Sequence, residues 1–215
     1  MTNFSLTNVP TVPYIDGKTS PDFREYGAKR GKIGVFAIHG GGIEIGTEQI
    51  ARNIAKRTNC SVYIFSGRKK TGNNNLRISS IEFASLNHPL FSNILSHIEK
   101  IVAIHGHNQN KKDIHIGGRN VDLKSKIAEA LKKRLPEYHV ITFLHEIPDL
   151  MKGIDPNNFV NLPQERGMQI ELPQALRVAK KTTGWSRHEW SDLYGDTIKV
   201  AGTLAEIINS YPGGR

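Results

Sequence analysis

The residues best suited to chemistry lie in one short segment that runs from a histidine to a glutamate. His39 follows the apolar run 33–38, and three glycines and Ile43 separate it from Glu44. Glycines permit a tight turn with unusual backbone angles, so the carboxylate is expected to return beside the imidazole. Because imidazole and carboxylate groups are common ligands of zinc, this segment predicts part of a metal site.

Two more apolar runs end in a side chain that could serve such a site: residues 101–104 lead to His105, and residues 168–170 lead to Glu171. In open α/β sheets, ligands bind beyond the carboxyl ends of the strands, so parallel neighbouring strands would bring these side chains to one edge. Two histidines and one glutamate form a known class of catalytic zinc site that leaves a fourth position to water. The predicted ligands are His39, Glu44 and His105. Glu171 is predicted to be the general base that takes a proton from metal-activated water.

Each of these positions also has a plainer explanation. A histidine at a strand end is often only a surface residue, and Glu44 could instead stabilise the N-terminus of the following helix. His107 is an alternative third ligand, but His105 directly follows the apolar run and is preferred. Cys60 is the only cysteine, which excludes an internal disulfide and a zinc site built from several cysteines.

The elements that must position these residues follow from the pattern of apolar side chains. Short apolar runs alternate with amphipathic stretches, which indicates an α/β layer fold with a largely parallel sheet. Strands are predicted at residues 33–38, 61–65, 101–104, 113–116, 139–143 and 168–172. Helices are predicted at residues 47–57, 89–99, 121–135 and 192–211. Residues 1–30 and 67–88 are expected to be irregular.

Length and composition suit a globular protein. We expect a single domain over residues 1–215, with its core at about 20–210. No apolar run approaches the ~20 residues that cross a bilayer. The N-terminus lacks the features of a signal peptide, so synthesis in the cytoplasm is expected, with any extracellular action following lysis or another route of release. The net charge of +9 suits an anionic partner such as an acidic polymer or nucleic acid.

The glycine-rich segment lacks the signatures of nucleotide binding. No lysine follows Gly46, as a phosphate-binding loop requires, and the full dinucleotide fingerprint is missing. The chain also has no Gly-x-Ser-x-Gly nucleophile elbow. We therefore expect neither a nucleotide cofactor nor a serine hydrolase of the α/β type.

Several strings of this sequence resemble those of the phage-type poly-γ-glutamate hydrolases. The similar strings are His-Gly-Gly-Gly-Ile-Glu-Ile-Gly-Thr-Glu at 39–48, Ser-Val-Tyr-Ile-Phe-Ser-Gly at 61–67, Leu-Arg-Ile-Ser-Ser at 76–80, Ile-His-Gly at 104–106, Ile-Gly-Gly-Arg-Asn at 116–120 and Gly-Met-Gln-Ile-Glu-Leu at 167–172. The resemblance covers roughly residues 20–210 in consistent order.

This resemblance implies a single-domain, zinc-carboxypeptidase-like fold with three α/β/α layers and an open mixed sheet. It implies a zinc hydrolase that cuts γ-linked glutamate polymers internally, which would help a phage or a host to remove a capsule. By position, it assigns one zinc ion per chain to His39, Glu44 and His105. It assigns the role of general base to Glu171.

Such a substrate carries a carboxylate on every residue, and arginine binds carboxylates through two parallel hydrogen bonds. Arg119 follows another predicted strand end and is the first candidate for substrate binding, while Arg77 and Arg166 are further candidates. Each of them could equally be an ordinary surface charge. The net charge of +9 would steer a long polyanion toward the protein.

Two other functions remain open from the sequence. The same chemistry could act on γ-D-glutamyl links in peptidoglycan. A non-enzymatic phage protein that binds nucleic acid would also use the positive charge, although no zinc finger or basic-aromatic cluster supports it. We expect a monomer with no membrane partner.

Overall fold

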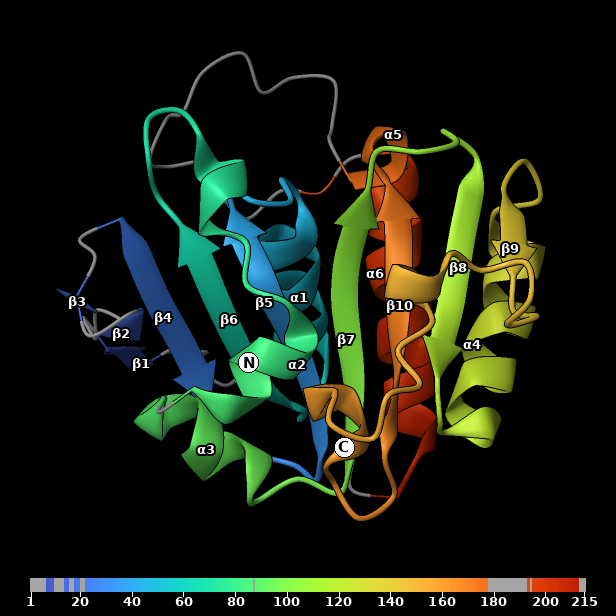
Figure 1. Cartoon of the computed structure of the whole chain (residues 1–215). Coiled ribbons are helices and arrows are strands. Elements are labelled where there is room, and N and C mark those ends of the chain that lie inside the picture. Colours follow the sequence, from blue (N-terminus) through green and yellow to red (C-terminus); the bar gives the residue numbers. More distant parts are fainter. Residues whose placement is uncertain are drawn as a thin grey trace.

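The centre of the structure is a mixed sheet of eight strands in the order β1-β4-β6-β5-β7-β10-β8-β9 (Figure 1). The computed structural model describes residues 7–9, 14–15, 18–19, 22–86, 88–177, 193 and 195–212. The strands of the sheet are β1 (Thr7–Val9), β4 (Phe23–Ala28), β5 (Ile33–Gly41), β6 (Ser61–Gly67), β7 (Lys100–His107), β8 (Asp113–Gly118), β9 (His139–Ile141) and β10 (Gly167–Pro173). A separate pair consists of β2 (Tyr14–Ile15) and β3 (Lys18–Thr19).

Helices cover both faces of this sheet, which confirms the predicted three-layer α/β/α architecture (Figure 1). One face carries α1 (Thr47–Arg57), α4 (Val121–Arg134) and α6 (Gly195–Ser210). The other face carries α2 (Ser80–Ser85) and α3 (Pro89–Leu95). The short helix α5 (Gln174–Arg177) directly follows β10, and 3-10 turns occur at Asn73–Leu76, Asp149–Met151 and Phe159–Asn161. No helix in the described part of the chain is long and apolar enough to cross a membrane.

Each face of the sheet has its own apolar core. Strand β5 is buried along its whole length because helices cover it on both sides. Val35 and Ala37 pack into the core beneath α1, α4 and α6. Phe36 and Ile38 point the other way, into an aromatic-rich core beneath α2 and α3. This alternation fixes which face of the sheet each side chain near the strand ends can reach.

The direction of the strands decides which strand ends meet. Strands β6, β5, β7 and β10 are parallel, so their carboxyl ends share the upper edge of the sheet in Figure 1. Strand β8 runs antiparallel to β10, and its partner β9 follows the direction of β8. The carboxyl end of β8 consequently lies at the opposite edge of the sheet.

Most of the predicted elements are present, with small differences at their ends. The strand predicted at 139–143 ends at Ile141, and the helix predicted at 89–99 ends at Leu95. The helix predicted at 192–211 spans Gly195–Ser210, and residue 192 lies outside the described residues.

The expectation of irregular structure at 1–30 and 67–88 was wrong in part. The first range contains β4, in which buried and half-buried side chains alternate as in an ordinary strand. The second contains α2, whose start has a capping box in which Ser79 and Glu82 each accept a backbone N–H of the other. Neither element contains a continuous apolar run, because β4 includes Arg24 and Glu25 and α2 includes Ser80 and Glu82.

A stability prediction follows from the aromatic core. The ring of Phe36 lies 5.6 Å from that of Tyr63, 5.8 Å from that of Phe91 and 5.9 Å from that of Phe159. Phe36→Ala should lower the free energy of unfolding by about 3–5 kcal/mol in urea denaturation, because it leaves a cavity. The matched control Phe143→Ala, at a residue that is 65% exposed, should change it by less than about 0.5 kcal/mol. Equal losses in the two variants would contradict this account of the core.

Candidate metal centre

The turn between β5 and α1 brings Glu44 back to His39. The Glu44 N–H donates to the His39 carbonyl over 2.8 Å, which closes the turn beside the imidazole. Gly41 has a φ of 67°, and a Cβ atom there would lie 2.2 Å from the Gly67 carbonyl oxygen. Only glycine fits such a position. The structure therefore contains the glycine turn that the sequence predicts.

Glu48, in the first turn of α1, anchors the other side of this turn. Its buried carboxylate accepts a hydrogen bond from Ser66 Oγ at 2.6 Å and forms an ion pair with Arg68 at 2.8 Å. Both partners lie at the carboxyl end of β6. The start of α1 is thus fixed to the strand beside β5, so the glycine turn is held at both of its ends.

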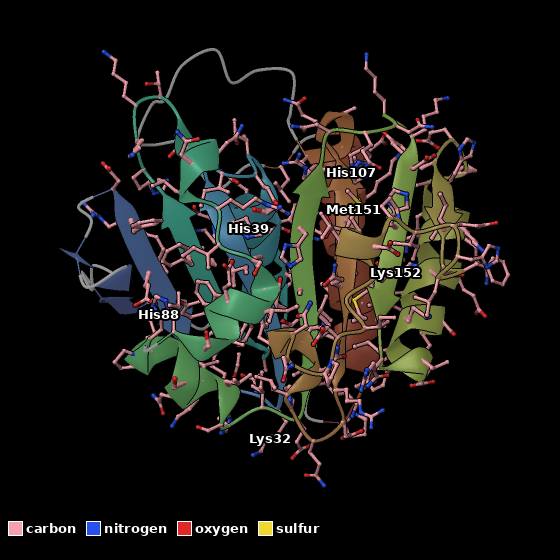
Figure 2. All side chains as sticks on the ribbon, in the orientation of Figure 1. Lys32, His39, His88, His107, Met151 and Lys152 are labelled. Atoms are coloured by element: carbon pink, nitrogen blue, oxygen red, sulfur yellow. The ribbon has the colours of Figure 1, made fainter. Side chains whose placement is uncertain are left out.

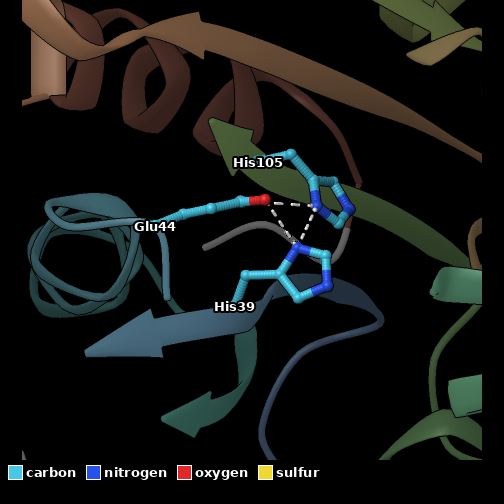
Figure 3. Close-up of side chains that lie close together, drawn as sticks. All are labelled: His39, Glu44 and His105. Atoms are coloured by element: carbon cyan, nitrogen blue, oxygen red, sulfur yellow. Dashed lines mark hydrogen bonds and ion pairs between the residues drawn. The ribbon is translucent and has the colours of Figure 1, made fainter. Parts of the chain in front are cut away.

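Three side chains converge where β5 and β7 end (Figure 3). His39 Nδ1 lies 2.8 Å from Glu44 Oε1 and 3.2 Å from His105 Nδ1. His105 Nδ1 lies 3.8 Å from Glu44 Oε2. All three residues are buried, and one potential ligand atom from each lies within 4.8 Å of the others. Within the described ranges, no other three residues of metal-binding type converge in this way.

A backbone carbonyl orients the ring of His39. His39 Nε2 lies 2.7 Å from the Ile78 carbonyl, which can only accept a hydrogen bond, so Nε2 carries an N–H. Nδ1 faces Glu44 and His105. Metal-binding histidines commonly use a carbonyl in this way to orient the ring.

His105 is neutral in this environment. Burial and the neighbouring His39 lower the pKa of His105 to about 3. Its Nδ1 faces the other two side chains, and its Nε2 has no hydrogen-bond partner among the described residues. The Nδ1 atoms of both imidazoles and the Glu44 carboxylate thus gather at one buried point, where they could bind a shared cation.

Glu44 is the anionic member of the cluster. Burial acts to raise the pKa of this carboxyl group, but the neighbouring His39, His105 and Arg77 outweigh burial and lower the pKa to about 2. Its Oε2 accepts the Gly106 N–H at 2.8 Å, and its Oε1 accepts a hydrogen bond from Arg77 Nε at 3.2 Å. The carboxylate is therefore ionised at neutral pH and fixed in position, as a metal ligand requires.

Glu171 lies beside this cluster. It is paired with His105 in the parallel register of β10 and β7, so the two side chains lie on the same face of the sheet. Gln169 Nε2 donates to Glu171 Oε1 at 3.2 Å, while the buried Oε2 has no partner among the described residues. Burial and the negative charge of Glu44 raise the pKa of Glu171 well above its usual range. A carboxyl group with a raised pKa is suited to proton transfer.

His107, the alternative third ligand, does not join the cluster. Its Nε2 lies 2.9 Å from the Asp113 carbonyl, and its Nδ1 accepts the Gln109 N–H at 3.2 Å. Both ring nitrogens are therefore used in hydrogen bonds. Figure 2 shows His107 at the end of β7, away from His39. The geometry favours His105 as the third ligand.

Of the three predicted arginines, only Arg77 reaches the cluster. Its Nε contacts Glu44, and half of its side chain is exposed. It belongs to the segment between β6 and α2, which also supplies the Ile78 carbonyl to His39. This segment thus contributes two contacts to the candidate metal centre.

Arg119 and Arg166 lie at the opposite edge of the sheet. Arg119 follows Gly118, which pairs with Met168 at the beginning of β10, and its Nε donates to a carbonyl in the loop after β9. Arg166 immediately precedes β10, and its carbonyl accepts the Ile101 N–H near the start of β7. Because β8 is antiparallel to β10, the strand end that carries Arg119 lies away from the edge that holds the candidate metal ligands.

Sequence reasoning gave no role to two residues near the cluster. Gln169 holds Glu171 and lies two positions before it on the same face of β10, a spacing that could have revealed the contact. Arg177 is buried and donates to three backbone carbonyls around the cluster. No sequence pattern indicates that contact, because any residue type can provide a carbonyl.

The sequence is similar to that of a known protein family and of two curated proteins. Residues 17–194 match the protein family described as poly-gamma-glutamate hydrolase. The UPF0714 protein YndL of Bacillus subtilis (strain 168) is 30% identical over 175 residues, which are 78% of this chain and 64% of YndL. The SPbeta prophage-derived UPF0714 protein YoqZ of the same strain is 34% identical over 100 residues, which are 46% of this chain and 35% of YoqZ. The aligned part of the chain thus spans less than two thirds of either relative.

Two solved structures have the same fold. A bacteriophage poly-gamma-glutamate hydrolase has a TM-score of 0.74 at 24% identity, over 86% of this chain and 87% of that chain. A structure described as zinc-free apo YndL has a TM-score of 0.73 at 24% identity, over 88% of this chain and 90% of that chain. The arrangement of sheet and helices is therefore shared with both.

The metal affinity of alanine variants should distinguish the role of His105 from that of His107. His105→Ala removes a candidate ligand, so we expect it to weaken Co²⁺ binding by more than the roughly 10–100-fold that loss of an outer-shell partner costs. His107→Ala should change the affinity by only a few fold, because this ring is already engaged in other hydrogen bonds. Titration followed by the visible absorption of Co²⁺ measures both. A larger loss in His107→Ala would show that the third ligand is misassigned.

Proposed function

Since the chain belongs to the poly-gamma-glutamate hydrolase family, we propose that it is a zinc-dependent hydrolase that cuts γ-glutamyl amide bonds of poly-γ-glutamate. The observation that carries this proposal is the buried set of His39, Glu44 and His105 with Glu171 beside it. One zinc ion per chain would bind to the first three residues. Removal of a poly-γ-glutamate capsule is the use that we propose for this activity.

The donor set supports zinc as the metal. Two imidazole nitrogens bound to one tetrahedral zinc ion at ~2.0–2.1 Å lie about 3.3 Å apart, and the Nδ1 atoms of His39 and His105 are 3.2 Å apart. Three protein ligands leave the fourth position open, as in catalytic zinc sites. The description of the similar YndL structure as zinc-free also supports this choice of metal. When bound, zinc supplies a Lewis acid and lowers the pKa of its water to about 7.

Glu171 is the group that we propose as the general base. It is the carboxyl group next to His105, and one of its oxygens has no hydrogen-bond partner among the described residues. Gln169 orients the other oxygen. Glu171 would take a proton from the attacking water as a general base and deliver it to the leaving amine as a general acid.

Arg77 is the residue that we propose for binding a substrate carboxylate. Each unit of poly-γ-glutamate has a free carboxylate, and a guanidinium group binds it with charge-assisted hydrogen bonds. The half-exposed Arg77 is already held next to the cluster by Glu44. The net charge of +9 would attract the polymer at long range.

The proposed chemistry is tested with Glu171→Gln. This variant keeps the size of the side chain but removes the base, so it should bind zinc as wild type does and lose about 10²–10⁴-fold in kcat. The chain length of poly-γ-glutamate after incubation measures turnover, and elemental analysis measures zinc. Glu129→Gln, at an exposed position on α4, is the matched control and should retain full activity.

Two outcomes would contradict these assignments. Turnover of Glu171→Gln at the wild-type rate would remove Glu171 from the mechanism. If wild-type protein shortens the glycan-linked peptides of peptidoglycan and leaves poly-γ-glutamate intact, the proposal of poly-γ-glutamate as the substrate is wrong. Peptidoglycan is therefore included as a second substrate in the same assay.

A pair of arginine variants tests the substrate contact. Arg77→Gln should lower kcat/KM for poly-γ-glutamate about 10–150-fold, because a hydrogen bond to a charged group contributes about 1.5–3 kcal/mol. Arg119→Gln should leave kcat/KM nearly unchanged, because Arg119 lies at the opposite edge of the sheet. A comparable loss in both variants would mean that the polymer extends along the whole face of the protein.

A further inference from the structure

We propose that Arg177 is a positioning residue that holds together the three chain segments of the metal centre. This inference rests on the proposed zinc site. Arg177 is the last residue of α5 and its side chain is only 5% exposed. Burial of a guanidinium group is costly unless its donors are satisfied, so its hydrogen bonds must be the reason for its position.

The guanidinium group of Arg177 donates to three separate segments. Nη1 donates to the Ile45 carbonyl at 2.6 Å, Nε donates to the Leu172 carbonyl at 3.0 Å, and Nη2 donates to the His107 carbonyl at 3.3 Å. Nη2 also lies 3.4 Å from Asn108 Oδ1. One side chain therefore joins the glycine turn, the end of β10 and the end of β7.

Each of these three carbonyls lies one or two residues after a side chain of the site. The side chains that precede them are Glu44, Glu171 and His105, respectively. Three of the four residues of the proposed active site thus come from segments that Arg177 joins. Any shift of one segment relative to another would have to break a hydrogen bond to this guanidinium group.

The chemistry of arginine suits this task. Its planar group has five N–H donors in a fixed arrangement, so it sets angles between its acceptors as well as distances. A lysine side chain donates from one point and cannot reproduce this geometry. Burial lowers the pKa of the Arg177 guanidinium group, and the nearby carboxylate of Glu44 acts in the opposite direction.

Gly106 provides the space for the guanidinium group. A Cβ atom at residue 106 would lie 2.3 Å from both Cζ and Nε of Arg177. The N–H of Gly106 donates to Glu44 Oε2, so the same residue contacts the positioning group and a proposed ligand. Alanine at this position would keep the backbone donor and displace the guanidinium group.

The test compares zinc affinity in folded variants. Arg177→Gln and Arg177→Lys should each bind zinc about 10–100-fold more weakly than wild type in competition with a chelator, the usual effect of losing an outer-shell partner. Arg134→Gln is the control, because Arg134 makes only an exposed ion pair with Glu206. Far-UV circular dichroism establishes that each variant is folded at the temperature used. A purely structural Arg177 would lower the melting temperature without changing the zinc affinity of the folded protein.

A second variant decides the question if Arg177→Gln does not fold. Gly106→Ala should weaken zinc binding by a similar factor. In the Arg177→Lys background it should cause little further loss of zinc affinity, because both changes act on the same group. Wild-type zinc affinity in any folded variant of Arg177, or in Gly106→Ala, would overturn the positioning role. Failure of the wild-type protein itself to bind zinc would instead refute the proposed function.

Discussion

The hydrogen bond from the Glu44 N–H to the His39 carbonyl is the constraint on which the candidate site depends. It turns the chain back within five residues and places a carboxylate beside an imidazole. The left-handed conformation of Gly41 and the close approach of Gly67 make the turn possible. Once the turn is closed, Glu44 Oε2 can accept the Gly106 N–H, which links the turn to the neighbouring strand β7. A local turn thereby fixes a contact between segments about sixty residues apart.

The two buried glutamates of the site have opposite protonation preferences because their surroundings differ. Glu44 accepts hydrogen bonds from Gly106 and Arg77 and lies against two imidazoles, so its pKa falls to about 2. Glu171 is buried with one weak amide donor and with the charge of Glu44 nearby, so its pKa is raised. One carboxylate is thus suited to hold a cation and the other to exchange a proton. Pairs of carboxyl groups that are separated in this way are a recurring basis for acid-base catalysis.

The parts of the site that could be predicted from sequence depend on residues close together in the chain or on neighbouring parallel strands. His39 and Glu44 are joined by a turn whose glycines are visible in the sequence. His105 and Glu171 each follow an apolar run, and the parallel register of β7 and β10 pairs them directly. The reversal of β8 leaves no comparable sign in the sequence, so the pattern around Arg119 did not indicate which edge of the sheet it occupies. The role of Arg177 depends on backbone carbonyls from three distant segments, which no spacing of side chains can reveal.

Because β8 runs in the reverse direction, the connections before and after it lie at opposite edges of the sheet. Residues 108–112 connect β7 to β8 across the carboxyl end of β10 (Figure 1). Residues 119–120 connect β8 to α4 at the far edge of the sheet. An insertion in the first connection would therefore lie at the edge of the sheet where the candidate metal ligands gather. An insertion in the second would disturb the start of α4 instead, where Asn120 accepts the Leu123 N–H and donates to the Glu165 carbonyl, and would act on folding rather than on the site.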